Sequence, residues 1–250
     1  MPTNQGKLKE REVVDHLNSK RVSELPNNLR SFMRNLYGSL DEEEIITCEW
    51  IDDSIKPDFV ITYKGIKKYI SMKSGRAESV HQEKIKTFIL FLREHGISKE
   101  TQKTILLYHY GDGTLDGSGK ERYDYNRLRV ILNDRIERAN QELNASKDFV
   151  WETISRCVLL GILENAIPID GIYFGDYRFG VLATTAQIKK HMERKDWDWM
   201  QNLHIGPLQI RPHARYIGKE IKHPEAREKV ECYWANLASD IDYISSRYDY

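Results

Sequence analysis

The chain has 250 residues, 40% of them hydrophobic, with 38 basic and 38 acidic side chains and a net charge of zero. This composition is ordinary for a globular protein and excludes collagen-like, coiled-coil and largely disordered chains. The longest apolar run, Val158–Leu163, is far shorter than the roughly 18 residues of a membrane helix. The charged residues Lys7, Lys9, Glu10 and Arg11, without an apolar region beside them, do not fit a signal peptide, so we expect a soluble, cytoplasmic protein with no membrane partner.

The neutral total charge argues against a protein that holds nucleic acid by bulk electrostatics alone, although a local basic cleft stays possible. The cysteines, Cys48, Cys157 and Cys232, are odd in number and far apart in the sequence. They therefore predict neither a disulfide framework nor a thiolate zinc site.

The first elements in chain order are two helices and a strand. Helical spacing of apolar residues predicts a helix over residues 7–18, and a second helix over 28–37 ends at Gly38. An acidic segment, residues 41–44, then leads into a strand at Ile45–Trp50.

Residues 57–75 contain two β-rich runs that flank a short turn, which predicts a hairpin. Glycine suits the first central position of a type II′ turn, so we expect Gly65-Ile66 as the loop and Asp58 opposite Lys73. Because side chains alternate between faces, one face is apolar and buried, with Phe59, Ile61, Ile70 and Met72. The opposite face carries Asp58, Ser71 and Lys73 at the open end of the hairpin.

The rest of the chain alternates between expected helices and strands. A capping box at Ser79 and Gln82 predicts a helix that ends at Gly96, and a buried strand follows at Thr104–Tyr110. Further helices are expected over 125–143, 149–163 and 224–245, a hairpin over 172–174 and 179–183, and strands at 208–210 and 214–217. This alternation predicts a mixed α/β or α+β fold.

A carboxylate and a lysine at the end of a strand pair suit metal-dependent hydrolysis of phosphodiesters. The carboxylate can hold a hard divalent cation, and the lysine can orient water or stabilise developing negative charge. One carboxylate is rarely a sufficient ligand set, so a second acid is expected nearby. Glu83, in the first turn of the expected helix, is the first choice. The alternatives are Glu78, Glu49, and Glu10 or Glu12 on the first helix.

These residues resemble a known family. Pro57-Asp58 followed by Ser71-Met72-Lys73 is similar to the PD-(D/E)XK nuclease superfamily, best known from type II restriction endonucleases. Asp58 and Lys73 match the pattern, whereas Ser71 departs from it where an acid is usual. Some members carry Ser-x-Lys and take the missing carboxylate from the helix downstream, the role that Glu83 would fill. The resemblance covers roughly residues 45–110.

The resemblance implies a restriction-endonuclease-like core, with a central mixed β-sheet flanked by helices. It implies Mg²⁺ dependence, with Mn²⁺ able to substitute, a metal bound by Asp58, Glu83 and the main-chain carbonyl of Met72, and double-stranded DNA as substrate. We expect a single nuclease domain over 1–250, with a catalytic core at about 41–110. The C-terminal half, 121–250, would serve DNA recognition or dimerisation in a prokaryotic type II restriction enzyme acting as a homodimer.

Basic residues are candidates for DNA contacts because guanidinium groups match guanine and phosphate geometry. They are Arg76, Lys120, Arg178, Arg211 and Arg215. Two alternatives to a restriction enzyme stay open: a nuclease effector of another defence or repair system, and a non-catalytic DNA-binding protein in which Ser71 marks a decayed metal site.

Overall fold

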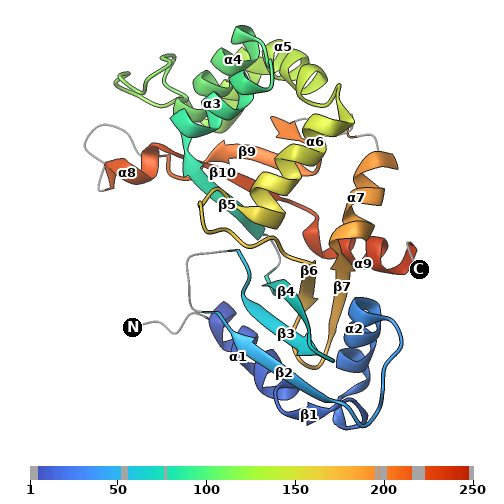
Figure 1. The fold of residues 1–250 in the computed structure, drawn as a ribbon. Helices are drawn as coiled ribbons and strands as arrows, with labels where there is room; N and C mark the ends of the chain where they lie inside the picture. The colour runs from blue at the N-terminus through green and yellow to red at the C-terminus, as the bar shows by residue number, and fades with distance from the viewer. Residues whose placement is uncertain are drawn as a thin grey trace. The chain divides into compact units, whose positions relative to one another are not determined.

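The computed structural model describes residues 5–51, 56–75, 78–194, 197, 202–215 and 223–247 (Figure 1). The chain folds into two compact units, each built from segments that are distant in the sequence. Unit 1 comprises residues 1–78, 158–194 and 236–250, and unit 2 comprises residues 79–157 and 195–235. Within the described residues, no helix has the length and apolar character that crossing a membrane requires.

Unit 1 is built on a six-stranded sheet with the order β1-β2-β3-β4-β6-β7. Its strands are β1 (Lys20–Arg21), β2 (Ile45–Trp50), β3 (Phe59–Tyr63), β4 (Ile66–Lys73), β6 (Gly171–Gly175) and β7 (Gly180–Thr184). Its helices are α1 (Gln5–Leu17), the 3-10 helix η1 (Val22–Glu24), α2 (Asn27–Tyr37), α7 (Thr185–Arg194) and α9 (Leu237–Arg247). The sheet is mixed, because β4 and β6 are parallel and the other neighbours are antiparallel.

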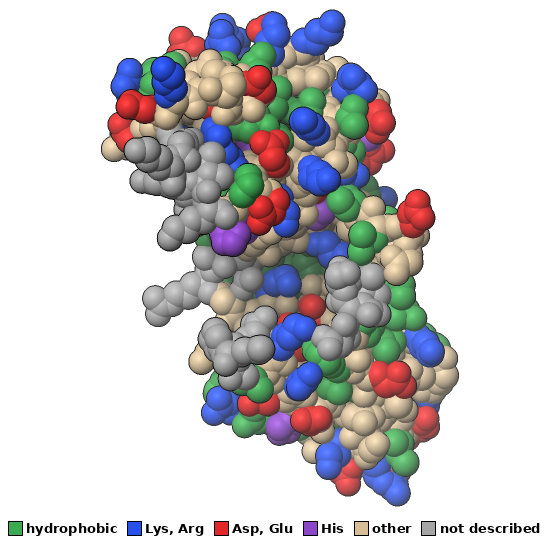
Figure 2. All heavy atoms as spheres, turned by 90° about the vertical axis from the view of Figure 1, so that its left-hand side faces the viewer, with side chains coloured by type: hydrophobic (Ala, Val, Ile, Leu, Met, Phe, Trp, Pro, Cys, Tyr) green, Lys and Arg blue, Asp and Glu red, His purple; other side chains and the backbone are tan. Residues whose placement is uncertain are grey.

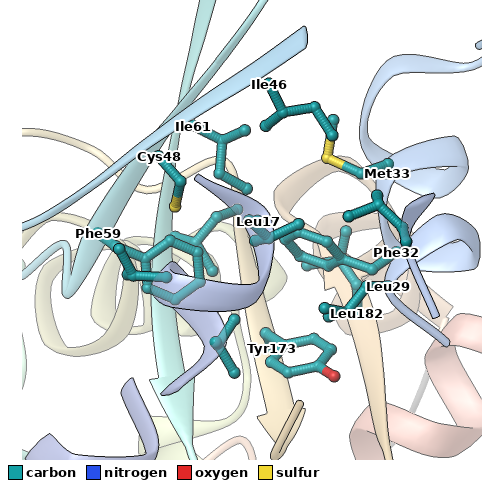
Figure 3. Packing of buried hydrophobic residues seen from close by; sticks show 14 of the residues in the cluster. Leu17, Leu29, Phe32, Met33, Ile46, Cys48, Phe59, Ile61, Tyr173 and Leu182 are labelled. Atoms are coloured by element: carbon teal, nitrogen blue, oxygen red, sulfur yellow. The ribbon is translucent and has the colours of Figure 1, made fainter. Parts of the chain in front are cut away.

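The core of unit 1 lies between this sheet and helices α1 and α2. Alternate residues of β2, β3, β4, β6 and β7 point into it, as the period of two in a strand requires. Figure 3 shows side chains of α1 and α2 converging with those of the strands. The cluster includes Leu17, Leu29, Phe32, Phe59 and Tyr173. This apolar layer orients the strands, so the alternate residues Val60, Ser71 and Ile172 lie on the other face of the sheet.

Unit 2 contains a four-stranded sheet with the order β5-β10-β9-β8. Its strands are β5 (Glu78–Lys84), β8 (His204–Ile205), β9 (Leu208–Pro212) and β10 (Lys229–Trp234). Its helices are α3 (Ile85–Glu94), α4 (Lys99–Tyr110), α5 (Tyr125–Leu143), α6 (Lys147–Ile154) and α8 (Pro224–Arg227). The π-helix η2 (Ser155–Leu160) continues α6 into unit 1. Helix α4 packs against α5 and β9, which brings the middle of the chain against its later part.

Several sequence predictions are confirmed. Helices α1 and α2 lie where they were expected, and α2 ends at Gly38 with a positive φ of 78°. Strand β2 and helix α5 have the expected boundaries, and β6 and β7 form the expected hairpin. The mixed α/β architecture is confirmed as well.

Two predictions around residues 79–110 are wrong. The chain from Ser79 to Gln82 belongs to strand β5, so the capping box does not form and α3 begins only at Ile85. Residues 104–110 belong to helix α4, not to a strand. The Ser98 side chain caps this helix by accepting a hydrogen bond from the Thr101 backbone, which favours the helix over the β-rich composition of the run.

The single closing helix expected over 224–245 is also wrong. The segment forms the short helix α8, the strand β10 and the helix α9. Val230 and Trp234 are spaced by four, which fits a helix, but Val230, Cys232 and Trp234 also alternate as one face of a strand and are all buried. Pairing of β10 with β9 decides between the two. Of the strand expected at 214–217, Ala214 and Arg215 are not in a strand, and residues 216 and 217 lie outside the described residues.

Candidate active site

The β3–β4 hairpin has a different register from the one predicted. Tyr63 pairs with Ile66, so the two-residue loop is Lys64-Gly65. Both loop residues have positive φ, 49° and 76°, the requirement of a type I′ turn. The prediction of a type II′ turn at Gly65-Ile66 is wrong because Lys64 adopts a left-handed conformation that a non-glycine residue seldom takes.

The corrected register moves every pair by two residues. Continued beyond the ladder, it sets Asp58 opposite Ser71, whereas the prediction set Asp58 opposite Lys73. A shift of two leaves each side chain on its original face, while a shift of one would reverse it. The assignment of Phe59 and Ile70 to the core and of Ser71 to the opposite face is therefore confirmed, but that opposite face is also covered, because Val60 and Ser71 are buried.

Asp58 lies just before β3 and connects it to β4 through its carboxylate. Its Oδ2 accepts a hydrogen bond of 3.0 Å from the Ser71 hydroxyl and one of 2.6 Å from the Met72 backbone N–H. Its own backbone is held on both sides, with its N–H bound to the Ile70 carbonyl and its carbonyl accepting from Ile51. This carboxylate is therefore fixed at the end of the strand pair, where β4 continues to Lys73.

Glu10 on helix α1 belongs to the same electrostatic environment. The Trp50 indole donates a hydrogen bond of 3.3 Å to its Oε2. Burial, and next the negative charge of Asp58, raise the pKa of Glu10, while the Trp50 bond and the positive charges of Lys73 and Lys7 oppose the rise. Glu10, Asp58 and Lys73 thus interact electrostatically within unit 1, although 63 positions separate the first from the last.

The other acids that the sequence offered differ in their surroundings. Glu12 and Glu49 are exposed, the first on α1 and the second on β2 opposite Val60. The side chain of Glu78 lies outside the described part of the structure. Glu10 is therefore the acid that is half-buried within the electrostatic reach of both Asp58 and Lys73.

Glu83 lies in unit 2 on strand β5, not in the first turn of a helix, so its expected position is wrong. Its fully buried carboxylate binds the Arg156 guanidinium at 2.6 Å and His81 at 3.1 Å. Burial raises the pKa of Glu83, but the bonds from His81 and Arg156 outweigh burial and hold it below its usual range. Glu83 is therefore a charged partner within unit 2.

A cysteine lies close to this pair. Ligand atoms of His81, Glu83 and Cys157 lie within 4.8 Å of one another, an arrangement that could hold a metal ion. The sulfur atoms of Cys157 and Cys232 are 3.5 Å apart, although 75 positions separate them in the sequence. Spacing along the chain gave no indication of this proximity, which arises because the start of η2 lies against β10 in the folded unit.

The basic residues singled out from the sequence are distributed over both units. Arg178 is exposed in the β6–β7 turn of unit 1, whereas Lys120 and Arg215 are exposed in unit 2. Arg211 is half-buried on β9, and Arg76 lies outside the described residues. On the face drawn in Figure 2, basic and acidic side chains are interspersed and do not form one continuous block of charge.

Comparison with solved structures identifies a similar fold. The restriction endonuclease MspI, in complex with its cognate DNA, aligns with a TM-score of 0.56 and 13% sequence identity. The alignment covers 91% of this chain and 88% of that chain. The fold is restriction-endonuclease-like. No protein-family model matches the sequence, and no curated protein matches it either.

Proposed function

We propose that the protein is a Mg²⁺-dependent endonuclease of the PD-(D/E)XK superfamily that cleaves double-stranded DNA at a specific sequence, as a type II restriction enzyme. The observation that carries the proposal is the Asp58 carboxylate, bound by Ser71 at the end of the strand that leads to Lys73, in a restriction-endonuclease-like fold. Trp50, which pairs with Phe59, holds the Glu10 carboxylate at the same end of the sheet. Metal-dependent hydrolysis of a phosphodiester requires two carboxylates and a lysine, and here the lysine is Lys73 of the Ser-x-Lys segment on β4.

The donor set fits a hard divalent cation. Carboxylate oxygens are the ligands that Mg²⁺ prefers, and Mn²⁺ accepts the same set. Asp58 disfavours the ionised form of Glu10, and a bound divalent cation would remove that penalty. We assign Asp58 and Glu10 as the metal ligands, in preference to Glu83, and the resemblance adds the Met72 carbonyl.

When bound, the cation would polarise the phosphoryl group and lower the pKa of a water molecule. In the hydrolysis, the water oxygen forms a bond to phosphorus, one P–O ester bond breaks, and the leaving oxygen takes up a proton. Lys73 would orient the attacking water or stabilise the charge that develops on the phosphoryl oxygens. Ser71 is a positioning residue in this assignment, because its hydroxyl donates to the Asp58 carboxylate.

The partner would be double-stranded DNA, and a symmetric cleavage site would be matched by a two-fold homodimer. We propose that the segment at about 41–110 supplies Asp58, Ser71 and Lys73 to the catalytic centre, that helix α1 adds Glu10, and that the C-terminal half, 121–250, contributes recognition or dimerisation. Lys120, Arg178, Arg211 and Arg215 are the candidates for DNA contacts.

The test is incubation of purified protein with unmethylated plasmid or phage DNA, in Mg²⁺ or in EDTA. We expect discrete fragments in the presence of Mg²⁺ and no cleavage in EDTA. The cleavage rate of Asp58→Ala and of Lys73→Ala should be at least about 100-fold lower than that of the wild type. Discrete fragments would identify a restriction enzyme, whereas a smear would identify a nuclease of another defence or repair system. The absence of cleavage with every metal, together with equal DNA binding by the wild type and both variants, would refute the catalytic assignment.

Two further variants distinguish the acids. Glu10→Gln should lose cleavage as Asp58→Ala does, whereas Glu12→Gln, an exposed position on the same helix, should cleave at the wild-type rate. Glu83→Gln should retain Mg²⁺-dependent cleavage per folded molecule. Loss of cleavage in a folded Glu83→Gln protein, with Glu10→Gln active, would transfer the second metal ligand to Glu83.

A further inference from the structure

Unit 2 contains a polar pocket that the catalytic assignment does not use. The pocket has a volume of about 220 Å³ and lies where β9 meets helix α4. It is lined by Tyr108, Asn202, Gln209, Ile210, Arg211 and Arg215. Small-molecule sites usually enclose about 300–1,000 Å³, so this smaller pocket suits contact with one edge of a group that is held from outside.

Arg211 is held in this pocket by an ion pair and by an aromatic ring. Its Nε donates a hydrogen bond of 2.6 Å to Oε2 of Glu231, its partner in the β9–β10 ladder. Its guanidinium also lies over the Tyr233 ring, 3.7 Å from the centroid. The ion pair and the ring fix the plane of the guanidinium, and the two terminal amino groups lie at the opposite end from Nε. A guanidinium whose plane is fixed can donate two parallel hydrogen bonds to a pair of acceptors, which is bidentate recognition. We call its two terminal amino groups the fork.

The charge of Arg211 is already neutralised by Glu231, and this decides what the fork can recognise. Burial raises the pKa of Glu231, but hydrogen bonds from Ser79 and Arg211 hold it below its usual range, so the group is a carboxylate at neutral pH. A carboxylate at this position repels phosphate, while it leaves hydrogen bonds to a neutral acceptor pair unaffected. Guanine presents such a pair, O6 and N7, in the major groove.

The neighbouring side chains agree with contact to base edges. Gln209 lies two residues before Arg211 on the same face of β9, at a spacing of about 6.6 Å, close to two base-pair steps of about 3.4 Å. Arg215 also lines the pocket but, in contrast to Arg211, it is exposed. An exposed cation beside a side chain that contacts base edges suits a phosphate.

We propose that this pocket reads sequence, with Arg211 as a specificity-determining residue that recognises guanine and Arg215 as a phosphate contact. The inference rests on the proposed DNA-cleaving function and names the residues that would select its substrate. Arg211 acts through its terminal amino groups, and Glu231 is the positioning residue that holds them.

The experiment measures base preference separately from cleavage. The full-length Asp58→Ala protein is bound to a randomised DNA duplex library with Ca²⁺, and the enriched sequences are compared with those of Asp58→Ala carrying Arg211→Lys or Arg215→Lys. Lysine keeps the positive charge beside Glu231 but removes the planar fork. Circular dichroism and thermal unfolding report whether each variant is folded, and Arg211→Ala is a second variant that lacks the planar guanidinium.

We expect Arg211→Lys to reduce preference at one or more guanine positions roughly ten-fold, within the range of one bidentate contact. The matched change Arg215→Lys should leave the enriched sequence as it is. An unchanged sequence in Arg211→Lys and Arg211→Ala would overturn the proposal. A uniform loss of affinity in Arg211→Lys with a smaller salt dependence would also overturn it, because that result indicates a phosphate contact. The proposal would fail as well if the Asp58→Ala parent protein enriched no sequence. Failure of the wild type to cleave DNA would refute the nuclease assignment alone, because enrichment is measured without cleavage.

Discussion

The buried histidine of helix α4 makes a quantitative prediction about how stability depends on pH. His109 is 2% exposed, and its Nε2 donates a hydrogen bond of 2.9 Å to the Arg227 carbonyl. Its Nδ1 has no hydrogen-bond partner among the described residues. Burial is the main reason that the pKa of His109 falls from 6.5 to about 4, and the charges of Arg122 and Arg227 add to it. A charged imidazolium here would place an unpaired N–H donor in the interior beside two cations.

The sign follows from proton linkage. Between the unfolded pKa of 6.5 and the folded pKa of about 4, the unfolded chain binds more protons at this site than the folded protein does. The free energy of unfolding therefore decreases as the pH is lowered through 6.5, and the contribution levels off below about 4. A tenfold difference in proton affinity between the two states corresponds to about 1.4 kcal/mol, so the full effect is about 3 kcal/mol and the part between pH 7 and pH 5 is about 2 kcal/mol.

The assay is urea unfolding followed by tryptophan fluorescence at a series of pH values from 7 to 5, for the wild type and His109→Gln. Glutamine can donate to the Arg227 carbonyl through its amide but does not titrate. Carboxylates contribute to the pH dependence of both proteins alike, so the difference between the two profiles isolates His109. We expect the wild type to lose about 2 kcal/mol more than the variant over this range. Parallel profiles would refute the reasoning, because they would mean that His109 titrates equally in both states.

Two further predictions concern the candidate active site and the β6–β7 hairpin. Burial and the charge of Asp58 raise the pKa of Glu10 above 4.5, and a bound divalent cation should lower that pKa. The Ca²⁺ affinity, measured by calorimetry, should therefore fall as the pH is lowered through the pKa of Glu10. The Glu10→Gln variant should bind Ca²⁺ more weakly, and its affinity should depend less on pH. An identical pH profile in the variant would contradict this. Gly175 has a φ of 140°, and an added Cβ would lie 2.1 Å from the Phe179 carbonyl oxygen. We therefore expect Gly175→Ala to lower the free energy of unfolding by at least about 2 kcal/mol, measured by thermal denaturation. Gly38→Ala, also at positive φ but with open space around it, should cost about 1 kcal/mol; equal losses in the two variants would show that the close approach has no effect.

Local patterns in the sequence were sufficient for the hairpin that carries Asp58. The alternation of polar and apolar residues from Phe59 to Lys73 assigns each side chain to a face, and that assignment survives a register error of two residues. The error itself arose because the turn depends on Lys64 accepting a positive φ, which no residue pattern indicated.

Segments whose apolar residues fit both the helical period and the strand period could not be assigned from the local sequence. Residues 104–110 have β-rich composition, but Thr101, Thr104, Ile105 and Tyr108 lie at helical spacing and are buried in α4. Val230 and Trp234 fit both periods as well. Packing partners that are distant in the sequence decide such cases, because the same apolar side chains can be buried by a helix or by a strand.

What the sequence by itself determined is the placement of an acid, Asp58, and a lysine, Lys73, on the face of a hairpin opposite its apolar core face. This was accessible because strand alternation is a local property of the backbone. Only the tertiary structure decided which acid lies within their electrostatic reach and which arginine is held by an ion pair and an aromatic ring. Glu10 interacts with Asp58 because α1 packs against β2, and Arg211 is fixed because β9 pairs with β10. Both contacts link segments that no local pattern connects, and Glu83, the nearer acid in the sequence, is instead bound to Arg156 in the other unit.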